Sequence, residues 1–116
     1  MTTKRVLFAP YFGFGHGLPF LTLASALESE GFEACVAAEG AILDQAGASQ
    51  VTIELPAGVM EVTDKIRSCT TTEEFAAALQ TLAERYAPFL RKVIDEQRVA
   101  AVVVDSLHLG AALAAQ

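Results

Sequence analysis

The strongest constraint on the fold of this 116-residue chain is the alternation of short apolar runs with longer stretches of helical periodicity. The apolar runs span residues 5–9, 33–38, 50–55 and 99–104. Runs of this length are typical of strands, and the nearly unbroken apolar character of the first and last is typical of strands buried on both faces. Because helical stretches separate the runs, the pattern predicts β-α-β units in an α/β fold with a doubly wound parallel sheet.

Helix signals lie between the predicted strands. Gly31 is expected to end the first helix as its C′ residue, and Thr71 and Glu74 have the spacing of a capping box. Pro88 is expected to kink or split the long third helix. The predicted helices span 18–30, 41–48, 73–96 and 109–115, whereas a turn-rich loop is expected at 10–17 and irregular structure at 56–67.

Charge and apolar content limit the classes of partner. Fourteen acidic residues against eight Lys and Arg give a formal net charge of −6, which disfavours nucleic acid and anionic membranes. The sequence contains no run of 18 apolar residues, so no transmembrane helix is predicted. Apolar residues make up 53% of the chain, more than a small domain needs for its own core, so part of this surface is expected to meet a partner domain. One domain spanning 1–116 is expected, with an incomplete sheet, because doubly wound domains usually have more strands.

The N-terminal segment and the two cysteines indicate the cellular compartment of the protein. Basic residues precede an apolar stretch, and 24–26 (A-S-A) resembles a signal-peptidase site. Glycines, prolines and His16 interrupt that stretch, which disfavours a signal peptide. Cys35 and Cys69 lack the spacing of a redox or zinc motif, so two reduced thiols are expected. We therefore predict a cytoplasmic protein without a metal site.

Two polar features follow predicted strands at the edge where parallel α/β sheets bind ligands. His16 lies in the glycine-rich loop after the first strand, and Asp105 directly follows the fourth. If those strands are neighbours, the two side chains can meet. A neutral imidazole can take a proton from an attacking hydroxyl, while a carboxylate fixes its tautomer. The alternatives are a structural histidine and an aspartate that only caps the next helix.

The segment 15–27 (G-H-G-L-P-F-L-T-L-A-S-A-L) resembles the G-H-x-x-P-x-x-x-L-A-x-x-L segment of the family-1 glycosyltransferases. Residues 30–33 (E-G-F-E) are similar to that family's turn into the second strand, and 46–48 (A-G-A) to the segment before the third. Residues 102–105 (V-V-V-D) resemble the strand whose terminal aspartate pairs with the catalytic histidine. The resemblance covers nearly the whole chain, but only the N-terminal half of a two-domain enzyme of the GT-B type.

The resemblance implies a Rossmann-like, acceptor-binding half of an enzyme of the bacterial natural-product type. This enzyme would transfer sugar from UDP- or TDP-sugar to a small-molecule hydroxyl by inverting displacement. His16 would be the base and Asp105 its orienting partner. The nucleotide sugar is a co-substrate, so no cofactor is expected, and the chain alone is expected to be inactive without a C-terminal donor-binding domain. Expected donor-side loop residues are Gly15 and Gly17, and expected acceptor-pocket residues are Phe12, Phe14, Met60, Leu107 and His108.

Two other functions stay open at this point. Residues 13–18 (G-F-G-H-G-L) partly match the G-x-G-x-x-G motif of dinucleotide-binding oxidoreductases, and Glu39 follows the second strand as a ribose-binding acid would. Leu18 stands where that motif has its third glycine. The other possibility is a non-catalytic subunit that needs a partner carrying the donor site.

Overall fold

Four parallel strands form the sheet of the computed structural model, which describes residues 4–11, 14–47, 49–105 and 115. The strand order is β3-β2-β1-β4, with neighbouring strands parallel throughout. This confirms the predicted α/β class and its parallel sheet. The strands are β1 (Arg5–Ala9), β2 (Glu33–Ala38), β3 (Val51–Glu54) and β4 (Ala101–Val104).

The register between β1 and β4 determines which residues lie next to each other at the carboxyl edge of the sheet. Ala9, the last residue of β1, pairs with Val104, the last residue of β4. The next residues of both strands, Pro10 and Asp105, therefore leave the sheet at the same level. Arg5 secures the opposite edge, where its guanidinium contacts the carboxylate of Glu33 and the side chain of Gln97.

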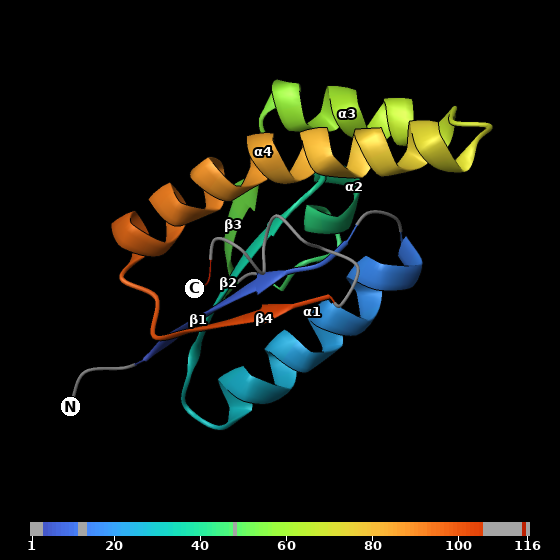
Figure 1. Ribbon diagram of the computed structural model, residues 1–116. Helices are drawn as coiled ribbons and strands as arrows, with labels where there is room; N and C mark the ends of the chain where they lie inside the picture. The colour runs from blue at the N-terminus through green and yellow to red at the C-terminus, as the bar shows by residue number, and fades with distance from the viewer. Residues whose placement is uncertain (1–3, 12–13, 48, 106–114, 116) are drawn as a thin grey trace.

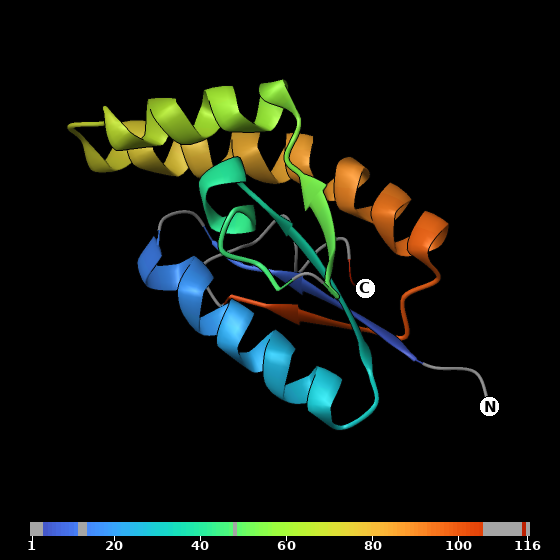
Figure 2. The same cartoon turned by 180° about the vertical axis from the view of Figure 1, so that it is seen from behind.

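Helices cover both faces of the sheet (Figures 1 and 2). On one face lie α1 (Phe14–Ser29) and the short α2 (Gly40–Leu43). On the other face α3 (Ala57–Arg67) and α4 (Thr72–Gln97) run side by side. In both views the turn between α3 and α4 extends past the carboxyl ends of the strands, in keeping with overall extents of 50 × 26 × 22 Å. None of the described helices is both long and apolar enough to span a bilayer.

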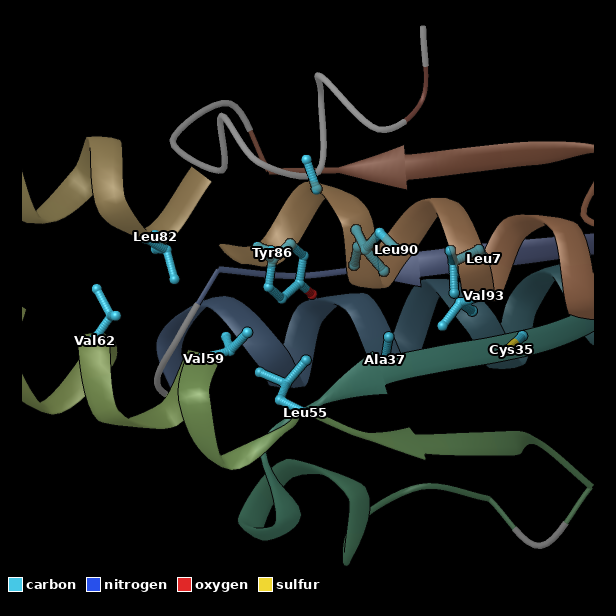
Figure 3. Close-up of a cluster of buried hydrophobic side chains, with 12 residues drawn as sticks. Leu7, Cys35, Ala37, Leu55, Val59, Val62, Leu82, Tyr86, Leu90 and Val93 are labelled. Carbon is cyan, nitrogen blue, oxygen red and sulfur yellow. The ribbon is translucent and has the colours of Figure 1, made fainter. Parts of the chain in front are cut away.

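Successive residues of the central strands point to opposite faces, so the core has two layers. Figure 3 shows the layer between the sheet and α3/α4, with side chains from β1, β2, α3 and α4 directed toward one another. We call it the α4-side cluster, and its buried residues are Leu7, Ala9, Cys35, Ala37, Leu55, Val59, Val62, Leu82, Tyr86, Ala87, Leu90 and Val93. The α1-side cluster consists of Val6, Phe8, Leu21, Ala24, Ala34, Val36, Ala38 and Ile42.

The expectation of irregular structure at 56–67 is wrong, because this segment contains α3. Val59, Val62 and Thr63 are buried on one side of that helix, whereas Gly58, Glu61 and Asp64 beside them are exposed. An apolar spacing of three to four residues signals such a helix, but the Pro-Ala-Gly sequence at 56–58 obscures it. Pro56 itself is the N-cap, and a proline before the first helical turn removes no hydrogen bond.

The long helix α4 continues through Pro88, so of the two predicted effects of this proline, a kink or a split, the split does not occur. Pro88 and Glu84 are both exposed, which lets water satisfy the carbonyl that the missing proline N–H leaves without a partner. The N-cap half of the predicted capping box at the start of α4 is confirmed, whereas the Glu74 carboxylate bonds the N–H of the residue before the N-cap. The Thr71 hydroxyl accepts a hydrogen bond from the Glu74 N–H at 3.1 Å, and the Glu74 carboxylate accepts one from the Thr70 N–H.

The boundaries of other elements differ from the predictions by a few residues. Helix α1 begins at Phe14 rather than at 18, so the glycine-histidine-glycine segment is its first turn and not part of a loop. Strand β4 begins at Ala101, and α2 ends at Leu43. Gly31 has a φ of 90° beyond the end of α1, as expected for a C′ glycine. The helix predicted at 109–115 lies, apart from Ala115, outside the described residues.

Candidate functional site

His16 and Asp105, which are 89 residues apart in the sequence, form a hydrogen-bonded pair. Nδ1 of His16 lies 2.6 Å from Oδ2 of Asp105. The first turn of α1 positions the histidine, and the end of β4 positions the aspartate. The pair exists because β1 and β4 are neighbours in register, and α1 begins a few residues after β1.

The exposure of the two side chains differs in a way that suits a base and its partner. The imidazole side chain is 39% exposed, whereas the aspartate side chain is 14% exposed. An ionised carboxylate can only accept hydrogen bonds, so Nδ1 carries the proton in the neutral imidazole. Nε2 then has the free lone pair, and it is the nitrogen left to accept a proton. The arrangement is therefore suited to general-base chemistry at Nε2.

Tyr11 is a further residue that contacts the imidazole of His16. Its ring meets that of His16 edge to face, with ring centroids 5.3 Å apart and an interplanar angle of 77°. Burial, and secondly the nearby carboxylate of Asp105, raise the pKa of the Tyr11 hydroxyl. Tyr11 was not predicted as a site residue, although it lies only two positions beyond β1 at the ligand-binding edge.

Gly15 and Gly17 flank His16 but have different environments. A Cβ at Gly15 would have no atom within 4 Å, whereas a Cβ at Gly17 would lie 2.5 Å from Cδ1 of Ile42. Gly17 therefore lets α1 approach α2 closely. This gives Gly17 a packing function, while Gly15 stays open beside the histidine.

The predicted acceptor-pocket residues are only partly covered by the structure. Met60 lies on α3, where it is partly buried against the α4-side cluster. Phe14 is the first residue of α1, but its side chain, together with Phe12, Leu107 and His108, lies outside the described residues. Two hollows of about 360 Å³ and 490 Å³ lie between α3 and α4 and between the end of α4 and β4. Neither contains His16 or Asp105.

Glu39 bears on the dinucleotide alternative. It follows β2 as expected, but its side chain is 14% exposed and its carboxylate lies 3.7 Å from the guanidinium of Arg67 on α3. A ribose-binding acid must present its oxygens to a ligand, so the low exposure of Glu39 and its contact with Arg67 do not favour that role.

Among the described residues, no group of three or more His, Cys, Asp and Glu side chains is placed to hold a metal ion.

Comparisons with known proteins identify the fold. No protein-family profile matches the sequence, and no curated protein is significantly similar to it. Among solved structures, UGT2 of Phytolacca americana, complexed with UDP-2-fluoro-glucose and pterostilbene, matches 93% of this chain with a TM-score of 0.65 and 17% identity. LpCGTa in complex with UDP matches 96% with a TM-score of 0.63 and 21% identity. A UGT transferase from Siraitia grosvenorii in complex with UDP matches 91% with a TM-score of 0.57 and 18% identity.

These matches cover 27%, 28% and 24% of the three solved chains, so this chain spans about a quarter of their length. At such identities the likeness concerns the fold. The described chain thus has the Rossmann-like α/β fold of one part of these GT-B structures.

Proposed function

We propose that this chain is the acceptor-binding part of a glycosyltransferase that uses a nucleotide sugar, with His16 as the general base. The observation that carries the proposal is the 2.6 Å contact between His16 and Asp105 at the carboxyl edge of a parallel sheet. The fold of the matched UGT structures, which hold UDP or UDP-2-fluoro-glucose, supports it. The family-1 assignment and a bacterial natural-product acceptor are part of the proposal.

The proposed reaction needs one proton acceptor from this chain. Nε2 of His16 removes the proton of an acceptor hydroxyl while that oxygen attacks the anomeric carbon of the sugar. The bond from this carbon to the nucleotide diphosphate breaks, and the configuration at the carbon inverts. Asp105 stabilises the imidazolium that forms, because its carboxylate already accepts the hydrogen bond from Nδ1.

The donor site lies elsewhere in this proposal. About three quarters of each matched structure has no counterpart in this chain, and we expect UDP- or TDP-sugar to be held largely by a separate donor-binding domain. No other cofactor is needed for the displacement. The 116-residue chain alone is therefore expected to bind an acceptor without transferring sugar.

A binding experiment on the chain itself tests the acceptor half of the proposal. Pterostilbene, which is present in the UGT2 complex, is a suitable phenolic probe. Its titration should shift the imidazole resonances of His16 in a saturable manner, whereas NAD should not. Saturable binding of NAD without any effect of phenols would instead support the dinucleotide-binding alternative.

The mechanism is tested in the chain joined to the three quarters of such an enzyme that it lacks, the donor-binding domain included, with UDP-glucose, TDP-glucose and a panel of phenols. His16→Ala should lower kcat by about 10²–10⁴-fold without loss of donor affinity, because general-base action typically contributes that much. Asp105→Asn should lower kcat less, since the imidazole remains. Glu30→Gln, which removes an exposed carboxylate beside Gly31 at the opposite edge of the sheet, is the matched control. Unchanged turnover in His16→Ala would make His16 a structural residue.

A further inference from the structure

The hydrogen bond to Asp105 fixes only one point of the His16 ring. The ring is also bonded to Cβ through Cγ, but small rotations about the Cα–Cβ and Cβ–Cγ bonds tilt it while the hydrogen bond at Nδ1 is kept. The direction of Nε2 changes with that tilt. The imidazole is 39% exposed, so the aspartate leaves room for such motion. A base that acts on a bound hydroxyl needs a defined direction for Nε2, because proton transfer requires hydrogen-bond geometry.

Tyr11 supplies a second contact, which is with the ring of His16 itself. Its ring lies edge to face with the imidazole at a centroid separation of 5.3 Å, within the range preferred by aromatic pairs. Tyr11 itself is anchored, since it is partly buried and packs against the α4-side cluster. Unlike Asp105, which reaches the imidazole from β4, Tyr11 reaches it from the end of β1.

We infer that Tyr11 is a positioning residue that limits the tilting of the His16 imidazole while Nδ1 is hydrogen-bonded to Asp105. The ring also stands beside the carboxylate and limits the access of water to the Nδ1–H···Oδ2 bond. The effect of Asp105 on the Tyr11 hydroxyl is a sign of this proximity. The inference deepens the proposed function, because a fixed Nε2 direction matters only if His16 acts on a substrate.

The test uses NMR on the 116-residue chain and requires no activity. The Nδ1–H proton of a shielded, carboxylate-bound imidazole gives a far-downfield resonance, which His16→Gln would assign by eliminating it. We expect Tyr11→Phe to keep the resonance, because the ring remains. Tyr11→Leu and Tyr11→Ala should lose it through exchange with water, although Leu keeps most of the apolar volume.

Phe89→Ala is the matched control. Phe89 is the edge-to-face partner of Tyr86 at 5.9 Å, so its removal deletes an equivalent aromatic contact elsewhere in the α4-side layer. The control should keep the His16 resonance, and methyl spectra of every variant establish that each is folded. If Tyr11→Ala does not fold, the comparison of Tyr11→Leu with Tyr11→Phe still shows whether the His16 resonance depends on the aromatic ring.

Three outcomes would overturn the inference. They are a resonance that survives in Tyr11→Leu and Tyr11→Ala, an equal loss in Phe89→Ala, and no downfield resonance in the unmodified chain. The result is separate from the test of the proposed function, in which His16→Ala is measured by sugar transfer. If the imidazole is fixed but the joined protein transfers no sugar, the proposed function is wrong, whereas the inference that Tyr11 positions His16 still holds.

Discussion

At the scale of single residues, the two glycines beside His16 show how one turn of helix serves both packing and access. Gly17 faces Ile42, and Gly15 faces open space. A methyl group would collide at the first position and meet nothing at the second. The same substitution should therefore have opposite effects at two sites only two residues apart.

We expect Gly17→Ala to destabilise the chain by about 1–3 kcal/mol, as overpacking in a closely packed contact does. Gly15→Ala should stabilise it by roughly 0.5–1 kcal/mol, because alanine has the higher helix propensity and this position is exposed. Urea unfolding of both variants measures the difference. A double variant, Gly17→Ala with Ile42→Val, should recover part of the loss, and equal effects at the two glycines would contradict the close α1–α2 contact.

At the candidate site, the residue types and their placement in the fold gave different information. His16 was recognisable from its glycine-rich context, and Asp105 from its position after an apolar strand. Tyr11 had no comparable motif, and only its edge-to-face contact with the imidazole identifies it. Residue type thus indicated the possible chemistry, whereas geometry selected the members of the site.

At the scale of elements, the start of α4 depends on local capping. The hydroxyl of Thr71 accepts the hydrogen bond from the N–H of Glu74, and Glu73 and Glu74 add negative charge in the first turn. Both interactions are local in sequence, which is why they were predictable. Helix α4 and its neighbour α3 form one cover of the sheet, so the cap affects the whole layer.

Thr71→Ala is expected to lower the free energy of unfolding by about 1 kcal/mol, the usual cost of losing an N-cap. Thr71→Ser should keep most of the stability, because the hydroxyl remains. Thr72→Ala, at the adjacent exposed helix position, is the control and should have little effect. Thermal unfolding followed by circular dichroism would measure all three, and an equal loss in Thr71→Ala and Thr72→Ala would exclude capping as the cause.

At the scale of the whole molecule, the sheet lies between two apolar layers and keeps ionisable groups away from water. Cys35 on β2 is fully buried, and burial raises the pKa of its thiol from 9.0 to about 11. Burial also raises the pKa of the Tyr86 hydroxyl in the same cluster. The folded state favours the neutral form of each group, so the free energy of unfolding is expected to fall as the pH becomes alkaline.

The sign of this linkage follows from the raised pKa. The unfolded state releases the thiol proton first, so the contribution of Cys35 to stability is complete below pH 9.0 and is lost as the pH rises toward about 11. Unfolding in urea at a series of pH values should show this decline. Cys35→Ala should decline less steeply over the same window, although it is less stable at neutral pH. An identical slope in both proteins would show that Cys35 does not titrate with unfolding.

By itself, the sequence determined the elements whose signals are local. The strands β1 and β2 were predicted with their observed bounds, and the N-cap Thr71 and the C′ glycine were predicted at the right residues. The alternation of strands and helices predicted the parallel sheet. Each depends on residues within a few positions of one another. Local propensity and the apolar period are sufficient in such cases.

Only the tertiary structure decided which distant residues meet. The sequence cannot show that β4 pairs with β1 so that Ala9 and Val104 lie in register, and this pairing brings Asp105 to His16. The structure also revealed α3, whose apolar spacing is obscured in the sequence by the Pro-Ala-Gly segment at 56–58. These features depend on contacts between segments far apart in the chain, whose free energy is gained only when the two layers pack around the sheet.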